Sequence, residues 1–152
     1  MKLDRLNAYK RCRERILALC SDEPDEVARM ASFVGVLHHE MSGFFWTGFY
    51  RVVDGVLVIG PYQGTVGSLR IAFGKGVCGT AAETGETQIV ADVHEFPGHI
   101  ACDSRSQSEI VVPVRNAKGQ LIAVLDIDST ELNHFDRSDR EQLEVLLAIV
   151  FS

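Results

Sequence analysis

A two-residue turn at Asp54-Gly55 joins two segments of alternating, mostly apolar character, residues 45–52 and 56–59. Asp-Gly between such segments is typical of a tight β-hairpin, because both turn residues must adopt positive φ angles. The pattern therefore predicts a pair of antiparallel strands. Short runs of apolar and β-branched residues bounded by turn signals predict further strands at residues 67–71, 88–90, 110–115 and 121–127.

Helical periodicity marks both ends of the chain and one short stretch in the middle. Residues 3–20, 24–41 and 77–83 are expected to be helical, and a last helix begins at Asp136, with Ser138 as the other candidate cap. The order of elements predicts one α+β domain over residues 1–152, with an antiparallel sheet flanked by N- and C-terminal helices. The alternative, a doubly wound parallel sheet, requires a regular alternation of strands and helices that the sequence lacks.

Charge and hydropathy exclude several classes of partner. The net charge of −6 argues against binding to a phosphate backbone, which requires a basic surface. No apolar run approaches the roughly 18 residues of a membrane span, and charges near the start leave no apolar stretch for a signal peptide. We therefore expect a cytoplasmic protein, in which the four cysteines remain reduced: Cys12, Cys20, Cys78 and Cys102.

Residues 91–108 form a long segment without clear periodicity that contains Cys102. Long loops inside a compact domain are usually functional or disordered, and the several reactive groups here favour a functional loop. His94 and His99 could supply the positive partner that a reactive thiolate needs, whereas Asp103 opposes a low pKa of Cys102. Taken alone, a half-buried loop thiol without chemistry is the better interpretation of such a cysteine.

Cys78 follows Gly74-Lys75-Gly76-Val77 at the start of the predicted short helix. The unsatisfied N–H groups of a helix N-terminus would lower the pKa of a thiol at this place. Packing of a small apolar side chain between helix and sheet is an equally good interpretation. The glycines resemble a phosphate-binding loop only weakly, because the complete motifs are missing.

Carboxylates and aromatic residues interrupt the predicted strands in a regular way. Asp126 and Asp128 alternate within an apolar strand and therefore face the same side, and Glu109 begins the preceding strand. These acids indicate either the solvated face of an edge strand or a pocket wall for a cationic amine or a proton-donating acid. Trp46 and Tyr50 share one face of their strand and form either part of the core or the wall of an apolar pocket.

Zinc binding is not expected, because the sequence contains no CxxC or HxxxH motif. Cys12 and Cys20 fall on the apolar face of the first helix, so they are predicted to be part of the core.

Several sequence strings together resemble the free methionine-R-sulfoxide reductases, a catalytic branch of the GAF domains. The resemblance covers nearly the whole chain and is strongest in these strings: Trp46-Thr47-Gly48-Phe49-Tyr50, Gly60-Pro61-Tyr62-Gln63-Gly64, Gly74-Lys75-Gly76-Val77-Cys78, Gly98-His99-Ile100-Ala101-Cys102-Asp103, Ser108-Glu109-Ile110 and Leu125-Asp126-Ile127-Asp128-Ser129.

The resemblance implies a six-stranded antiparallel GAF sheet and a small pocket for free methionine-(R)-S-oxide. Cys102 would attack the sulfoxide sulfur and become a sulfenic acid. The resemblance implies no bound cofactor and thioredoxin as the electron donor. Because similar proteins are often dimers, a homodimer is also expected. The residues that would bind the substrate or help to protonate its oxygen are Trp46, Tyr50, Glu109, Ile110, Asp126 and Asp128.

The sequence departs from the family pattern at Ser68. Members commonly carry there a cysteine that forms a disulfide with the nucleophile, and a serine cannot resolve a sulfenic acid. The resemblance makes Cys78 the substitute resolving thiol, provided that its sulfur reaches Cys102. Otherwise an external thiol must reduce Cys102 directly. The lost thiol also leaves open a second function, a non-catalytic GAF module that binds a small ligand or senses redox state.

Overall fold

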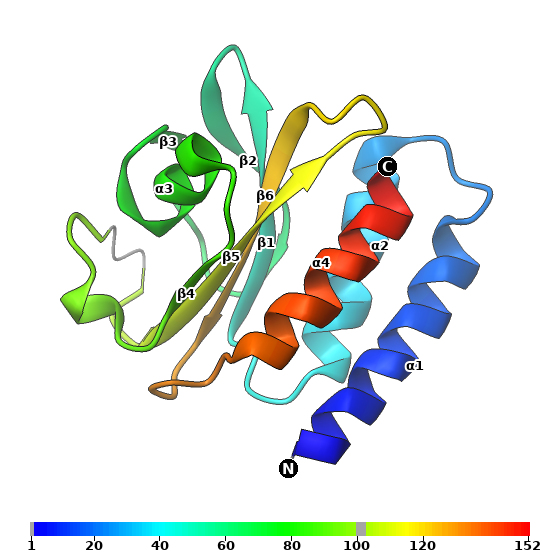
Figure 1. Cartoon of the computed structure of the whole chain (residues 1–152), viewed down its shortest axis with the longest axis horizontal. Coiled ribbons are helices and arrows are strands. Elements are labelled where there is room, and N and C mark those ends of the chain that lie inside the picture. The colour runs from blue at the N-terminus through cyan, green and yellow to red at the C-terminus, as the bar shows by residue number, and fades with distance from the viewer. Residues whose placement is uncertain (1, 100–102) are drawn as a thin grey trace.

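The computed structural model describes residues 2–99 and 103–152 and confirms a single α+β domain built on one six-stranded sheet (Figure 1). The strands lie in the order β3-β2-β1-β6-β5-β4, and each pair of neighbours is antiparallel. The helices and strands are α1 Lys2–Cys20, α2 Glu26–Glu40, β1 Trp46–Val53, β2 Val56–Gln63, β3 Arg70–Ala72, α3 Gly76–Thr84, β4 Gln88–Val90, β5 Ser108–Arg115, β6 Leu121–Ser129 and α4 Arg137–Phe151.

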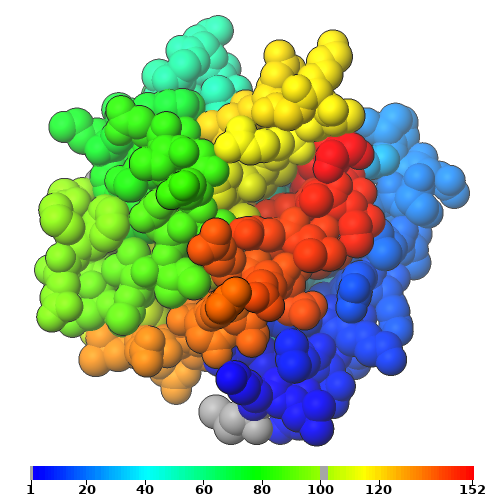
Figure 2. Space-filling view, viewed as in Figure 1, coloured from blue at the N-terminus to red at the C-terminus, as the bar shows by residue number. Residues whose placement is uncertain are grey.

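Helices cover both faces of the sheet (Figure 1). Helices α2 and α4 pack on one face, with α1 against both of them, and the short α3 packs on the opposite face. The space-filling view shows the orange-to-red α4 at the surface between the blue N-terminal helix and the green segments around α3 (Figure 2). No helix among the described residues is long and apolar enough to cross a membrane.

Two local signals in the sequence define element boundaries as predicted. Asp54 and Gly55 adopt φ angles of 50° and 76°, the left-handed conformation that the hairpin turn between β1 and β2 requires. The side chain of Asp136 accepts hydrogen bonds from the backbone N–H groups of Ser138 and Asp139, and the side chain of Asp139 accepts one in return from the N–H of Asp136. This capping box confirms Asp136, and not Ser138, as the start of α4.

The third strand is shorter than predicted. Residues 67–71 were expected to be extended, but β3 covers only Arg70–Ala72 and pairs with the first half of β2. Gly67 and Ser68 instead belong to the loop that precedes β3. The sequence alone does not reveal this boundary, because where β3 begins depends on its pairing with β2.

The sheet separates two apolar cores. Ile110, Val112 and Leu125 belong to the larger core under the three long helices, which also contains Cys12 and Cys20 as predicted. Trp46, Tyr50, Cys78, Val111 and Val124 belong to the smaller core under α3. Alternate residues of β5 and β6 therefore point into different cores, and the carboxylates of these strands share the face covered by α3.

Candidate active site

Three carboxylates lie at the centre of the sheet, on the face covered by α3. Glu109 of β5 is paired directly with Asp128 of β6, and Asp126 lies two residues earlier on the same strand. Glu109 and Asp126 are 5% and 6% exposed. Because β6 lies between β1 and β5, the interpretation of these acids as the solvated face of an edge strand is wrong. They form the wall of a pocket.

The pocket lies between the sheet, the start of α3 and two loops. The loop that precedes β3 contributes one side, and His99, Asp103 and Ser106 contribute another. The described residues that line it are Phe45, Trp46, Tyr50, Thr65, Val66, Gly67, Ile71, Lys75, Gly76, Val77, Cys78, His99, Asp103, Ser106, Glu109, Asp126 and Asp128.

Asp126 is held in conditions that favour its neutral form. Burial raises the pKa of this carboxyl well above its usual value, and the nearby charge of Glu109 raises it further. Within the described part of the chain, Oδ1 of Asp126 is buried and has no hydrogen-bond partner. A neutral carboxylic acid in this position can donate a proton to a bound ligand.

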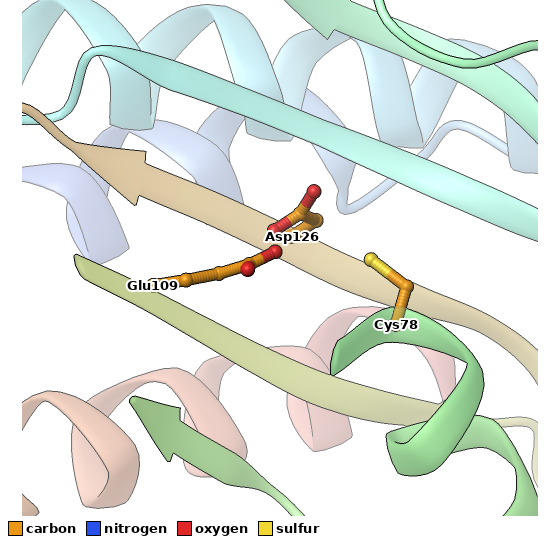
Figure 3. Close-up of side chains that lie close together, drawn as sticks. All are labelled: Cys78, Glu109 and Asp126. Carbon is orange, nitrogen blue, oxygen red and sulfur yellow. The ribbon is translucent and has the colours of Figure 1, made fainter. Parts of the chain in front are cut away.

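Cys78 projects from the first turn of α3 toward the carboxylates (Figure 3). Its Sγ and one carboxylate oxygen each of Glu109 and Asp126 all lie within 4.8 Å of one another. Burial raises the pKa of the Cys78 thiol well above its usual value, and the neighbouring carboxyl groups of Asp126 and Glu109 raise it further. The prediction of a lowered pKa at the helix N-terminus is therefore wrong, because burial and negative charge outweigh the helix dipole.

The neighbouring strand β1 contributes an aromatic wall, with Trp46 paired directly with Asp128 of β6. The ring of Trp46 stacks on Tyr50 at a centroid distance of 5.9 Å and on Tyr62 at 5.2 Å, and its Nε1 donates a hydrogen bond of 2.6 Å to the carbonyl oxygen of Thr65. A Cβ atom at Gly48 would lie 2.6 Å from the Trp46 ring. Glycine at this position therefore allows the indole ring to lie flat against β1 beside the carboxylates.

Sequence reasoning missed the contribution of Tyr62. The register of the hairpin pairs Tyr62 with Gly48, two residues from Trp46. Counting back along both strands from the Asp54-Gly55 turn places these residues close together. The count is not exact, because the pairing shifts register between Gly48 and Tyr50.

The loop residue Asp103 is fixed by charged and polar contacts. Its carboxylate forms an ion pair of 2.8 Å with Arg105 and accepts a hydrogen bond of 3.0 Å from the hydroxyl of Thr65. Hydrogen bonds from Arg105 hold the pKa of Asp103 well below its usual value. Arg105 in turn lies over the ring of Phe45, 4.7 Å from its centroid. The charge of Asp103 is thus largely offset by Arg105, a partner that sequence reasoning missed.

The two histidines of the loop have different surroundings. Nε2 of His99 lies 3.6 Å from Oε1 of Glu109, and burial lowers the pKa of this imidazole, which favours its neutral form. His94 is instead largely exposed and pairs with Asp92 at 2.8 Å. His94 is not among the described residues that line the pocket. Its pairing with Cys102 stays a prediction, because Cys102 lies outside the described residues.

Comparison with known proteins agrees with this geometry. A family model for the GAF domain matches residues 25–150. Over 131 residues, which cover 86% of this chain and 79% of the relative, the sequence is 44% identical to the free methionine-R-sulfoxide reductase of Escherichia coli. The chain belongs to the free methionine-R-sulfoxide reductase family. The reductase of Saccharomyces cerevisiae is 50% identical over 69% of this chain and 60% of its own length.

A solved reductase structure has the same fold. The X-ray structure of free methionine-R-sulfoxide reductase from Neisseria meningitidis in complex with its substrate superposes with a TM-score of 0.89 at 43% identity. The match covers 95% of this chain and 87% of that chain. The fold that the resemblance implied is therefore confirmed.

Three residues that the reductase resemblance singled out do not contribute a described side chain to the pocket. Cys102, the predicted nucleophile, lies outside the described residues. The side chain of Ile110 points into the core under the long helices, because consecutive strand residues face opposite sides. Its part in substrate binding stays a prediction, which only its backbone could fulfil. Ser68 is half-buried in the loop before β3, next to the pocket-lining Gly67.

Proposed function

We propose that this protein reduces free L-methionine (R)-S-oxide to L-methionine, with Cys102 as the nucleophile. The observation that carries the proposal is the meeting of a buried carboxyl group of raised pKa and an aromatic wall in one pocket. Asp103, the next residue after Cys102 in the sequence, lines the same pocket. Relatives with 44% and 50% identity are named for this activity.

The substrate fits the two walls in one orientation. A thioether methyl group is apolar and polarisable, so it is expected to pack against Trp46 and Tyr50. The ammonium group of a free amino acid requires negative partners, which Glu109 and Asp128 provide from adjacent strands. The need for an ammonium group close to the reacting sulfur explains a preference for the free amino acid over a methionine residue within a protein.

The chemical step follows from the protonation states in the pocket. The sulfur of Cys102 attacks the sulfoxide sulfur, and Asp126 in its neutral form donates a proton to the sulfoxide oxygen. The oxygen then moves to the Cys102 sulfur as the transient sulfur–sulfur bond and the sulfur–oxygen bond of the substrate break, so Cys102 becomes a sulfenic acid and methionine leaves as the reduced thioether. The proton of the Cys102 thiol passes to the Asp126 carboxylate and replaces the proton that Asp126 gave, so the step is neutral overall.

A second reaction must return Cys102 to the thiol. Two thiol equivalents reduce the sulfenic acid, release water and form one disulfide. We propose thioredoxin or another external thiol of the cytoplasm as the final electron donor, with Cys78 as the internal candidate for the first thiol. The raised pKa of Cys78 makes its thiolate scarce at neutral pH, so attack by Cys78 is expected to be slow.

The identity of the resolving thiol can be read by mass spectrometry after one equivalent of substrate. A disulfide between Cys78 and Cys102 would support the internal route. A persistent sulfenic acid, or a mixed disulfide with the added thiol, would reject it. Cys20→Ser is a matched control, because Cys20 is buried in the core on the other side of the sheet.

The activity itself is tested by incubating the protein with each epimer of free methionine sulfoxide and an excess of a small thiol. Methionine is expected to form from the R epimer alone, and Cys102→Ser should abolish its formation. Methionine from neither epimer, or undiminished turnover in Cys102→Ser, would refute the proposal.

Ser68 supports a second candidate function, a ligand-binding or redox-sensing GAF module. Without the usual resolving thiol at this position, a single oxidation of the protein could serve as a signal. Repeated turnover with an added thiol distinguishes the two functions. A module of this kind would yield at most one equivalent of methionine per chain.

A further inference from the structure

One cluster of side chains in the pocket has the composition of a metal site. Cys78, Glu109 and Asp126 come from α3, β5 and β6, so their relative positions are fixed by packing between the helix and the sheet. Each offers one ligand atom, and the three atoms lie within 4.8 Å of one another (Figure 3). All three side chains are buried. Such a cluster can surround a single ion with little rearrangement.

The donor atoms select the kind of ion. Zinc binds thiolate sulfur at about 2.3 Å and carboxylate oxygen at about 2.0–2.2 Å, which places the ligand atoms of a tetrahedral site roughly 3.3–3.8 Å apart. The atoms observed here need to approach by at most about 1.5 Å to meet that spacing. Magnesium and calcium prefer oxygen ligands alone, whereas a thiolate beside two carboxylates suits zinc.

A second observation points to a missing cationic ligand. Oδ1 of Asp126 is buried and lacks a hydrogen-bond partner within the described part of the chain, and Asp126 lines the pocket. A buried polar atom without a partner costs free energy until a ligand satisfies it. Asp128, on the same wall, adds negative charge that a divalent cation would offset.

His99 is a candidate for the fourth ligand. Its Nε2 lies 3.6 Å from Oε1 of Glu109, at the rim of the cluster. Zinc commonly combines imidazole with thiolate and carboxylate ligands in four-coordinate sites. The absence of a zinc motif from the sequence is no objection, because the ligands come from separate elements that only the folded sheet brings together.

We propose that the substrate pocket binds one zinc ion through Cys78, Glu109 and Asp126, with His99 as the fourth ligand. Bound zinc occupies the carboxylates that are proposed to receive the substrate, so the ion and methionine sulfoxide exclude each other. The competition rests on the proposed function, whereas the binding of zinc does not.

The binding is tested by titrating the whole chain, freed of metal by a chelator, with zinc in a calorimeter. One equivalent per chain is expected, and Cys78→Ser should weaken the affinity by about 10–100-fold or more. Cys20→Ser is the matched control and should leave the affinity unchanged. Asp126→Asn, which keeps the shape of the side chain, is the second ligand variant and should also weaken binding. Circular dichroism verifies that each variant is folded.

Cobalt provides a direct readout of the thiolate ligand. Addition of Co²⁺ to the wild-type chain should produce a sulfur-to-cobalt charge-transfer band in the near ultraviolet, which zinc abolishes by displacement. The band should be absent from Cys78→Ser and present in Cys20→Ser. No zinc binding by the wild-type chain, or an unchanged band in folded Cys78→Ser, would overturn the proposal.

The same samples separate the two proposals. If metal-free protein forms methionine from the R epimer but does not bind zinc, only the metal site is refuted. If it binds zinc through Cys78 but forms no methionine, only the reductase function is refuted. If both hold, zinc should raise the apparent KM for the sulfoxide and leave kcat unchanged.

Discussion

Replacing Asp126 with asparagine should make the protein more stable and less active at the same time. Because burial and Glu109 raise the pKa of Asp126 above its usual 3.8, the folded protein keeps a proton that the unfolded chain has lost. The free energy of unfolding of the wild type therefore falls with rising pH between 3.8 and the folded-state pKa of Asp126. The decrease is about 1.4 kcal/mol per pH unit. Below 3.8 the penalty vanishes.

Asp126→Asn keeps the volume of the side chain but cannot ionise, so it removes this pH dependence. Its stability advantage over the wild type should grow from about pH 4 until the folded-state pKa of Asp126 is reached. The slope belongs to the pair of carboxyl groups, because Glu109 contributes to the shift of the Asp126 pKa. Turnover should fall by about 10²–10⁴-fold, the usual contribution of a general acid.

Urea unfolding of both proteins across this pH range measures the effect, with Asp22→Asn as a control at an exposed carboxylate. The control should follow the wild type at every pH. Parallel stability curves for the wild type and Asp126→Asn would show that Asp126 titrates normally, and the assignment of a neutral acid in the pocket would then be wrong.

Two further substitutions test the supports of the site and of the fold. Gly48→Ala places a Cβ 2.4 Å from Cβ of Tyr62 and 2.6 Å from the ring of Trp46. It should therefore lower the free energy of unfolding, measured in urea, by about 1–3 kcal/mol and raise KM, because the indole ring is displaced. An unchanged KM would contradict the role of the aromatic wall. Asp139→Ala removes a fully buried carboxylate that accepts a hydrogen bond from the Tyr9 hydroxyl and forms an ion pair with Arg5. The variant should therefore lose about 3–5 kcal/mol of stability. Tyr9→Phe should lose only about 1 kcal/mol, because Arg5 still pairs with the Asp139 carboxylate. Equal losses of stability in the two variants would contradict a stabilising ion pair.

Most of the fold could be predicted because its signals are local. The Asp54-Gly55 turn, the cap at Asp136 and the helical periodicity each depend on residues close together in the sequence. The start of β3 could not be predicted in this way, because it depends on pairing with β2.

The candidate site was predicted less completely, for a related physical reason. Period-two alternation correctly placed Asp126 and Asp128 on one face, but only the strand order shows that this face is buried. The pKa of Cys78 was predicted in the wrong direction, because the carboxylates beside it lie far away in the sequence. The ion pair that fixes Asp103 is local, yet a loop conformation gives no periodic signal.

Cys102 is proposed to remove the oxygen of the sulfoxide. A single-turnover experiment on the fully reduced protein, without added thiol, measures this step alone. An excess of free methionine-(R)-sulfoxide should release one equivalent of methionine per chain from the wild type, together with loss of the Cys102 thiol. Cys102→Ser should release none. Release of methionine by Cys102→Ser, or none by the wild type, would contradict the account.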